Sequence, residues 1–291
     1  MPQQGNLDGL LETAHSTEKQ DTDTLNVVSF TDATQDANLA DTSSSYALAA
    51  ADYDMDGDID LAISHHGYIT IRENLGEGIF APPIYPGGNY LRDVHGLSFA
   101  DFNNDSRTDL VVMKGAKRGQ GQGANEYYLN KKKGFKTTKQ PDLLTDSFGR
   151  GRSSVPLDLN GDGWLDILLL NITQKEKEHR LAISTHKKGT KFSAFEGGNR
   201  FPGFRMNGVI QVDIFNKGEN LFLVRSGPQN AGAVFMFSDG IFKNMTKDLG
   251  LPKGGDITAA IPFDYDNDGD MDIFLASSAS GEPVSYTHLR A

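Results

Sequence analysis

The stretch Asp52–Ser64 reads DYDMDGDIDLAIS, and it decides the fold. Within its first nine residues every odd position is an aspartate, position 6 is Gly57, and a short apolar run follows directly. Glycine adopts positive φ without steric strain, so an Asp-rich segment with glycine at position 6 is typical of a tight loop. The apolar run after it is short and bounded by turn residues, which is typical of a strand. The sequence therefore predicts an acidic loop that leads into a β-strand.

This pattern is repeated along the chain without gaps. Three further copies are DFNNDSRTDLVVM from Asp101, DLNGDGWLDILLL from Asp158 and DYDNDGDMDIFLA from Asp264. Their starts are separated by 49, 57 and 106 residues, and the last interval is about twice the others. A unit that has lost most of its acids, GVIQVDIFNKGENLFLV around Asp213, lies inside that interval. Self-similarity at this period indicates repeated supersecondary units.

Each unit has the signature of four short strands. Apolar segments such as YALAAA and HGLSFA precede the loops, and LAIS, LVVM, ILLL or IFLA follow them. A second strand pair closed by a glycine-containing turn comes next, as in ITIRENLGEGIF, YYLNKKKGF, LAISTHKKGTKF and VFMFSDGIF. Four strands per unit at a period near 50 residues predict a propeller blade. The predicted fold class is all-β, a β-propeller of four-stranded blades with about five units visible, as a fragment of a larger ring.

The predicted boundaries follow from the repeat. Residues 1–26 are interpreted as a leader or the end of a preceding segment, and residues 27–281 as the propeller repeats. Residues 282–291 fit no repeat and are interpreted as a non-native tail. FTDATQDANL, residues 30–39, matches FKNMTKDLGL, residues 242–251, and is expected to be the outer strand of a blade. The units are expected near residues 46–83, 95–137, 153–195, 207–246 and 256–277.

The loops have the donors that calcium prefers, because calcium takes six to eight hard oxygen ligands in irregular geometry. Side chains at positions 1, 3, 5 and 9 and the carbonyl at position 7 would surround one ion per loop, about four ions in all. The predicted side-chain ligands are Asp52, Asp54, Asp56, Asp60, Asp101, Asn103, Asp105, Asp109, Asp158, Asn160, Asp162, Asp166, Asp264, Asp266, Asp268 and Asp272. The predicted carbonyl ligands are those of Asp58, Arg107, Trp164 and Asp270. Ser106 replaces glycine in the second loop, so that site is expected to be strained and weaker, and Asp213 is expected to bind no metal.

Three alternatives compete with calcium binding in these loops. A single acidic loop could be a solvated turn, but four copies in register disfavour this interpretation. An EF-hand needs a glutamate at position 12 and flanking helices, whereas position 12 is Ile63, Val112, Leu169 or Leu275. Magnesium would prefer fewer protein ligands and a tighter octahedron.

The D-x-[DN]-x-D-G-x-x-D loop between two strands, repeated at blade spacing, resembles the FG-GAP/VCBS repeat family. The x-N-x-G-x-F turn and the F-x-x-x-T-x-D-x-x-L linker look most like the branch with bacterial surface proteins and cartilage acidic protein. The resemblance covers about residues 27–277. It implies a ring of four-stranded blades, usually about seven, with calcium loops on one face and ligand binding on another. It implies adhesion or recognition of a protein or carbohydrate partner, with no catalytic residues.

Composition narrows the function classes. The net charge of −11 disfavours nucleic acid as a partner, because phosphate binding needs a basic face. The loops hold 14 Asp as side-chain ligands, and Lys and Arg slightly outnumber the acids that remain, so the acidity is concentrated where a cation would bind. The chain has no cysteine, and no apolar run approaches the length that spans a membrane. Calcium dependence favours an extracellular, periplasmic or cell-surface location.

Candidates for other chemistry are few. His65–His66 is the one close histidine pair, and a surface or blade-end role is favoured over a ligand or catalytic role. Lys131–Lys133 is expected to be a solvated hairpin tip, and Trp164 is expected to pack against a neighbouring blade. GQGQG at residues 119–123 lacks the helix that a dinucleotide fingerprint requires. The alternative function is a propeller-type lyase or glycosidase whose catalytic carboxylates lie outside the acidic loops.

Overall fold

The computed structural model describes a chain made almost entirely of antiparallel sheets. It describes residues 31–41, 43–87, 93–115, 123–137, 142–145, 151–171, 180–184, 192–194, 208–212, 220–225, 233–238, 241–248, 257–264, 267, 269, 271–277 and 285–287. The predicted leader (residues 1–26) and Asp213 lie outside these residues. In the described part, helix is limited to α1 (Asp142–Thr145), and no helix there has the length and hydrophobicity needed to cross a bilayer.

Five sheets follow one another in the described part of the chain, and each begins with a strand in the equivalent position. These first strands are β1 (Ala47–Ala51), β4 (Val94–Ala100), β8 (Gly151–Leu157), β12 (Gly208–Val212) and β16 (Ile257–Phe263). Each pairs with the strand that follows it, across the acidic loop in four of the five units. These second strands are β2 (Asp60–His65), β5 (Asp109–Lys114), β9 (Asp166–Asn171), β13 (Asn220–Arg225) and β17 (Asp272–Ser277).

A third and, in three sheets, a fourth strand complete each unit. The third strands are β3 (Tyr68–Arg72), β6 (Glu126–Lys131), β10 (Arg180–Ser184), β14 (Ala233–Ser238) and β18 (Ser285–Thr287). The fourth strands are β7 (Gly134–Thr137), β11 (Phe192–Ala194) and β15 (Ile241–Asn244). In the first sheet single bridges, Ile71 to Ile84 and Asn74 to Phe80, stand in place of a fourth strand. The strand β18 falls in the segment interpreted as a non-native tail, and it pairs with β17.

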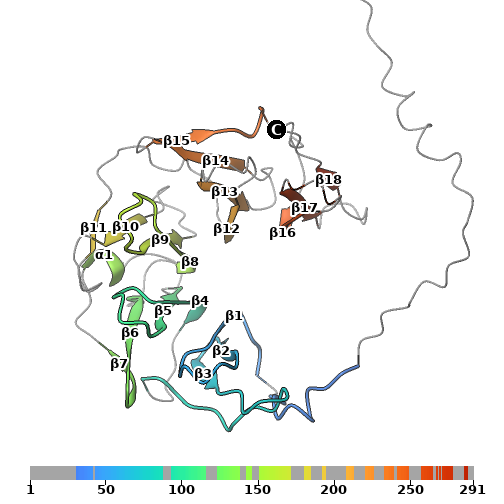
Figure 1. Cartoon of the computed structure of the whole chain (residues 1–291), viewed down its shortest axis with the longest axis vertical. Coiled ribbons are helices and arrows are strands. Elements are labelled where there is room, and N and C mark those ends of the chain that lie inside the picture. The colour runs from blue at the N-terminus through green and yellow to red at the C-terminus, as the bar shows by residue number, and fades with distance from the viewer. Residues whose placement is uncertain are drawn as a thin grey trace, which may run out of the picture.

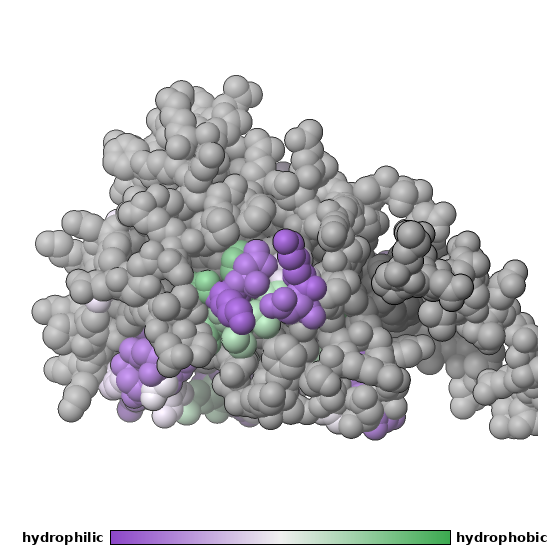
Figure 2. Space-filling view, turned by 90° about the horizontal axis from the view of Figure 1, so that it is seen from above, coloured by the Kyte–Doolittle hydropathy of each residue, from purple (hydrophilic) through white to green (hydrophobic). Residues whose placement is uncertain are grey.

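The sheets are arranged in the manner of propeller blades. First strands of consecutive sheets lie side by side, β1 with β4, β4 with β8, β8 with β12, and β12 with β16. In Figure 1 the sheets follow an arc from β1–β3 in blue to β16–β18 in red, with the first strands on its inner side. In the view from above, hydrophilic and hydrophobic residues lie beside one another in one small central area (Figure 2). The predicted all-β class and repeated antiparallel sheets are confirmed.

The core is divided into clusters, each between two consecutive sheets. Ala62 and Ile69 of the first sheet pack with Leu110 and Val112 of the second. The other face of β5, with Val111 and Met113, packs with Ile167 and Leu169 of the third sheet. Leu168 and Leu170, on the opposite face of β9, pack with the fourth sheet. Successive strand residues point to opposite faces, so a sheet covered on both faces needs an uninterrupted apolar run such as LVVM or ILLL.

The FTDATQDANL segment has the same turn as its predicted match, at equivalent positions. Asp32 Oδ1 accepts the Thr34 N–H at 2.9 Å, and Asn244 Oδ1 accepts the Thr246 N–H at 3.0 Å. In the first case the chain after the turn contacts the first sheet, where the Phe80 N–H donates to the Ala37 carbonyl at 3.1 Å. The described residues of this segment, 31–39, form this turn and no strand.

Close approach of β4 and β8 depends on Gly96. A Cβ at this position would lie 2.4 Å from the Arg152 carbonyl oxygen. We expect Gly96→Ala to lower the free energy of unfolding by about 3 kcal/mol, because rigid backbone cannot yield as a side chain can. Urea denaturation measures the loss. The control is Gly134→Ala, where an added Cβ meets open space and only the positive φ of 96° opposes it, so its cost is about 1 kcal/mol. Equal costs for the two variants would contradict the close-packing argument.

Candidate metal centre

The carboxylate at position 1 organises each loop by accepting backbone N–H groups from inside it. Asp52 accepts the Met55 N–H at 2.7 Å and the Asp56 N–H at 3.1 Å through Oδ1, and the Gly57 N–H at 3.0 Å through Oδ2. Asp101, Asp158 and Asp264 accept the N–H of position 6 in the same way, at 2.7, 2.8 and 3.0 Å. The loop is therefore wound around its first side chain.

This winding requires left-handed backbone at two positions of the loop. Position 6 has φ of 99° at Gly57, 66° at Ser106, 83° at Gly163 and 90° at Gly269. Position 4 is also left-handed, at Met55, Asn104, Gly161 and Asn267. The strain predicted at Ser106 is thus present in the backbone. The left-handed position 4 was not predicted, and Met55 gives no sequence signal for it.

The carboxylate at position 9 is buried in all four loops, at Asp60, Asp109, Asp166 and Asp272. Asp60 Oδ2 accepts the Tyr53 N–H at 3.0 Å, and its Oδ1 accepts the Asn74 N–H at 2.7 Å. Asp166 Oδ2 accepts the Leu159 N–H of its own loop at 2.9 Å. Position 9 therefore ties the start of the loop to the start of the second strand, and in the first unit also to the following hairpin.

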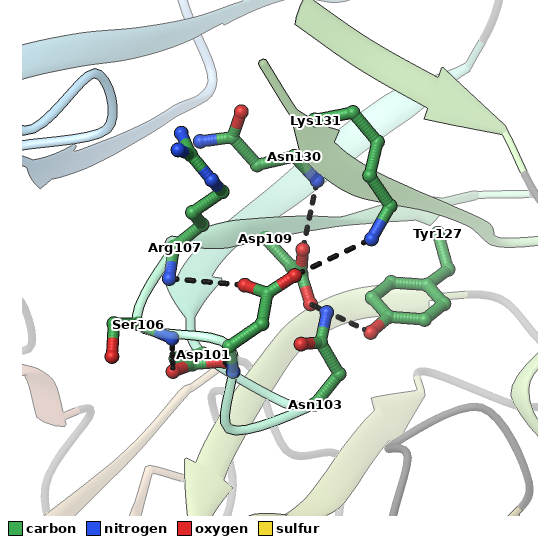
Figure 3. A network of polar contacts seen from close by, with 9 residues as sticks. Asp101, Asn103, Ser106, Arg107, Asp109, Tyr127, Asn130 and Lys131 are labelled. Carbon is green, nitrogen blue, oxygen red and sulfur yellow. Dashed lines mark hydrogen bonds and ion pairs between the residues drawn. The ribbon is translucent and has the colours of Figure 1, made fainter.

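In the second loop, side chains join the backbone in the network around this carboxylate (Figure 3). Asp109 accepts the Asn130 N–H at 2.8 Å, the Tyr127 hydroxyl at 2.8 Å and the Asn103 amide Nδ2 at 3.0 Å. Lys131 Nζ lies 3.3 Å from Asp105 Oδ2. The role of Tyr127 was not predicted, and Lys131 was expected in a solvated tip, whereas this lysine pairs with a predicted ligand. Asn74 and Asn130 occupy the same position in the hairpins of the first and second units, and this repetition in the sequence could have indicated their contact with the loop.

The structure brings predicted ligands of the first loop together. Carboxylate oxygens of Asp52, Asp54 and Asp60 all lie within 4.8 Å of one another. The position-5 carboxylates accept the backbone N–H of position 7 instead. Asp56 accepts that of Asp58, and Asp105 accepts that of Arg107.

Trp164 is half-buried, and its backbone N–H donates to Asp162 Oδ1 at 2.9 Å. Of the fourth loop, Asp266, Asp268 and Asp270 lie outside the described residues. Strands flank the loops, whereas an EF-hand would have helices there.

The electrostatics of the loops favour a bound cation. Burial, with Asp60 and Asp56 nearby, raises the pKa of Asp54. Burial raises the pKa of Asp60 and raises that of Asp109 to about 6. Gathering carboxylates in a partly buried place opposes their ionisation, and a divalent ion among them removes that opposition. The donors are all oxygen in the first loop, which fits calcium. In the second loop the Asn103 amide would have to turn to present its oxygen.

One part of the chain matches a known repeat family. Residues 52–112 match the model of the FG-GAP-like repeat. This segment is similar to the FG-GAP-like repeat. It contains the first two acidic loops and the strands between them, so the predicted resemblance to this repeat family is confirmed there. No curated protein matches the chain.

Solved structures resemble the chain at low sequence identity. They include a lectin from Agrocybe aegerita that recognises non-reducing terminal N-acetylglucosamine, at 17% identity and a TM-score of 0.48 over 82% of this chain. A protein from Lactobacillus plantarum has 10% identity and a TM-score of 0.47, with 86% of this chain and 71% of its own covered. An exo-β-1,3-galactanase from Clostridium thermocellum has 11% identity and a TM-score of 0.46 over 81% of this chain. The chain spans 65% of the lectin and 56% of the galactanase.

The strain at Ser106 can be tested by exchange with glycine. We expect Ser106→Gly to raise the free energy of unfolding in EDTA by about 1 kcal/mol, because glycine adopts a φ of 66° without the steric penalty of a side chain. The reciprocal variant, Gly57→Ser, should lower it by a similar amount. Thermal and urea denaturation measure both. A strained second loop would be contradicted if Ser106→Gly did not stabilise the protein and Gly57→Ser did not destabilise it.

The buried Asp109 predicts a pH dependence of the metal-free protein. Its pKa in the folded state is raised to about 6 from 3.8, so folding favours the protonated form. The stability contributed by that preference is present below about pH 4 and is lost as the pH rises through about 6. In EDTA, the stability difference between wild type and Asp109→Asn should therefore shrink from pH 4 to pH 7. Urea titrations at several pH values measure this difference, and a constant difference would contradict the prediction.

Proposed function

We propose that this chain is a calcium-binding β-propeller module that recognises a protein or carbohydrate ligand without catalysing a reaction. The observation that carries the proposal is the convergence of Asp52, Asp54 and Asp60 within 4.8 Å in a loop whose backbone is already wound to hold them. The recurrence of the same winding at Asp101, Asp158 and Asp264 supports about four equivalent sites. All-oxygen donors favour calcium over transition metals.

Calcium would act here as a structural ion. Each loop lies at the corner between the first and second strands, and in the first three loops the second residue is anchored in the core between two sheets. Tyr53, Phe102 and Leu159 are these anchors. An ion that fixes the loop would therefore also fix how one sheet packs against the next.

The loops are linked to one another by hydrogen bonds. Asn130 Nδ2, in the hairpin that holds the second loop, donates to the Tyr53 carbonyl of the first loop at 2.5 Å. Asn104 Nδ2 of the second loop donates to the Gly163 carbonyl of the third at 3.1 Å. Binding of calcium at one loop should therefore favour binding at its neighbours.

A larger ring of about seven blades, as in propellers of this kind, is part of the proposal. Leu48 on β1 and Ile261 on β16, strands of the first and fifth sheets, are 61% and 56% exposed. Exposed apolar side chains on such strands are what additional sheets would cover. Because calcium is abundant outside cells, we place the module in an extracellular, periplasmic or cell-surface setting.

The alternative is a lyase or glycosidase, and its requirement is specific. A glycosidase needs two carboxyl groups that face each other about 5–10 Å apart. The polar cluster that the described residues form away from the loops has one carboxylate, Asp93, together with two histidines. This cluster alone therefore does not supply the pair of carboxyl groups that a glycosidase needs.

Calcium removal tests the structural role. We expect EDTA to lower the melting temperature, since an ion present at 100 times its dissociation constant adds about 2.7 kcal/mol to stability. Calorimetric titration of the EDTA-treated chain should count about four ions. An unchanged melting temperature would contradict structural calcium.

One variant pair assigns the ions to the loops. Asp54→Ala should remove or weaken one site, because its carboxylate belongs to the converging group. Asp58→Ala removes the same charge from the same loop, yet Asp58 is predicted to contribute only its carbonyl. The count of bound ions should fall in Asp54→Ala and stay unchanged in Asp58→Ala. Equal losses in both variants would show that general acidity, and no defined site, binds the ion.

Recognition without turnover is tested on carbohydrates directly. The calcium-loaded chain is applied to a glycan array, and bound glycans are then incubated with it and assayed for new reducing ends or unsaturated products. Binding without products supports the proposal, whereas products would establish the enzymatic alternative.

A further inference from the structure

A second polar cluster lies at the ends of the strands that point away from the acidic loops. It consists of His66, Asp93 and His95. The strand β2 begins at Asp60 of the first loop and ends at His65, and β4 contains His95 and ends just before Asp101 of the second loop. Six residues of extended chain separate Asp60 from His66, which is about 20 Å. This cluster is therefore distinct from the predicted calcium sites.

The two imidazoles converge on one carboxylate oxygen. His66 Nε2 lies 2.7 Å from Asp93 Oδ1, and His95 Nε2 lies 2.9 Å from the same oxygen. The ring centroids of the two histidines are 5.3 Å apart. Two segments of the chain therefore bring three possible ligand atoms together, although His66 and Asp93 are 27 positions apart in the sequence.

The surroundings hold these side chains in position. The Val94 N–H donates to the His66 carbonyl at 3.0 Å, and the Gly115 N–H donates to the Asp93 carbonyl at 2.6 Å. Tyr46 lies against both imidazoles, with centroid distances of 5.0 and 5.4 Å. A Cβ at Gly115 would lie 2.3 Å from the His95 ring, so glycine there leaves the space that the ring fills.

The exposure of the three side chains differs in a way that suits an accessible site. His95 is 16% exposed and Asp93 33%, whereas His66 is 56% exposed. Burial and the nearby Arg152 lower the pKa of His95, which favours the neutral imidazole that ligates metals. His66 is the most exposed of the three, so an ion could reach the cluster from solvent at this residue.

We propose that His66, Asp93 and His95 form a site for a transition-metal ion such as zinc, on the opposite end of the blades from the calcium loops. Two imidazole nitrogens and one carboxylate are a common three-ligand set for zinc, and they leave a fourth position open. Zinc–nitrogen bonds of about 2.0–2.1 Å set ligand atoms of a tetrahedron about 3.3 Å apart. The three atoms must therefore move outward by roughly half an ångström from their hydrogen-bonded distances.

Arg152 indicates what would occupy the open position. A Cβ at Gly115 would meet its Nη1 at 2.7 Å and the His95 ring at 2.3 Å, so the guanidinium and the imidazole border the same space. The positive charge of Arg152 disfavours a bare cation and is offset in part by Asp93. It favours an anionic fourth ligand, such as a carboxylate from a partner.

The competing explanation is a hydrogen-bonded cluster that fastens the strand ends without metal. In that case each neutral histidine donates its Nε2–H to Asp93, and no ion enters. The two explanations differ in whether the cluster binds a metal with defined stoichiometry.

Cobalt(II) and zinc titrations distinguish them. The full chain is first saturated with calcium, so that the acidic loops are filled, and is then titrated with cobalt(II) while visible absorption is recorded. We expect one equivalent to bind with the absorption of a low-coordinate nitrogen and oxygen site, and zinc to displace it. His66→Gln and Asp93→Asn should each weaken zinc binding by at least about tenfold, because loss of a ligand costs at least as much as loss of a group that only orients one.

Two controls make the result decisive. His15→Gln removes one histidine from elsewhere in the chain and should leave cobalt binding unchanged. The calcium stoichiometry and melting temperature of His66→Gln should match those of wild type, since His66 is exposed. Absence of a cobalt spectrum, or equal binding by wild type and His66→Gln, would overturn the proposal, and neither result depends on whether the loops bind calcium.

Discussion

The structure depends on a buried carboxylate at the corner of four of the five sheets, at Asp60, Asp109, Asp166 and Asp272. A carboxylate out of contact with water is unfavourable unless hydrogen-bond donors or a cation compensate it. At Asp60 and Asp109 the donors are backbone N–H groups of the loop or of the hairpin that follows. Compensating this one charge therefore fixes how the loop, the second strand and the hairpin lie relative to one another. The exposed carboxylates of the loop can then gather around an ion without any rearrangement of the sheet.

A second constraint acts between the sheets. Because β5 and β9 are covered on both faces, every residue of LVVM and ILLL must be apolar, and no face remains for polar residues. In these two strands polar residues are thereby restricted to the two ends. The acidic loops occupy one end, and the cluster of His66, Asp93 and His95 occupies the other.

Much of this could be predicted from sequence, because it is local or repeated. The loop positions, the strand after each loop and the strain at Ser106 all follow from spacing within a dozen residues. The contacts that were not predicted are of another kind. Tyr127 on β6 reaches Asp109 on the adjacent strand β5. His66 meets Asp93 only because Val94, the next residue, donates its N–H to the His66 carbonyl. Such contacts depend on how strands align, and one sequence contains no signal for that alignment. Met55 is a third case, since its left-handed backbone is imposed by Asp52 in spite of its side chain.

The separation of the two ends has a chemical consequence. Oxygen-rich loops select hard ions such as calcium, whereas imidazole with one carboxylate selects zinc and similar metals. Because the chain has no cysteine, imidazole is the strongest soft-metal donor available to it. Strands of five to seven residues hold the two donor sets too far apart to compete for one ion. Loading of the loops would then set the rigidity of the blades, while the other end stays available to a partner that brings an anionic group.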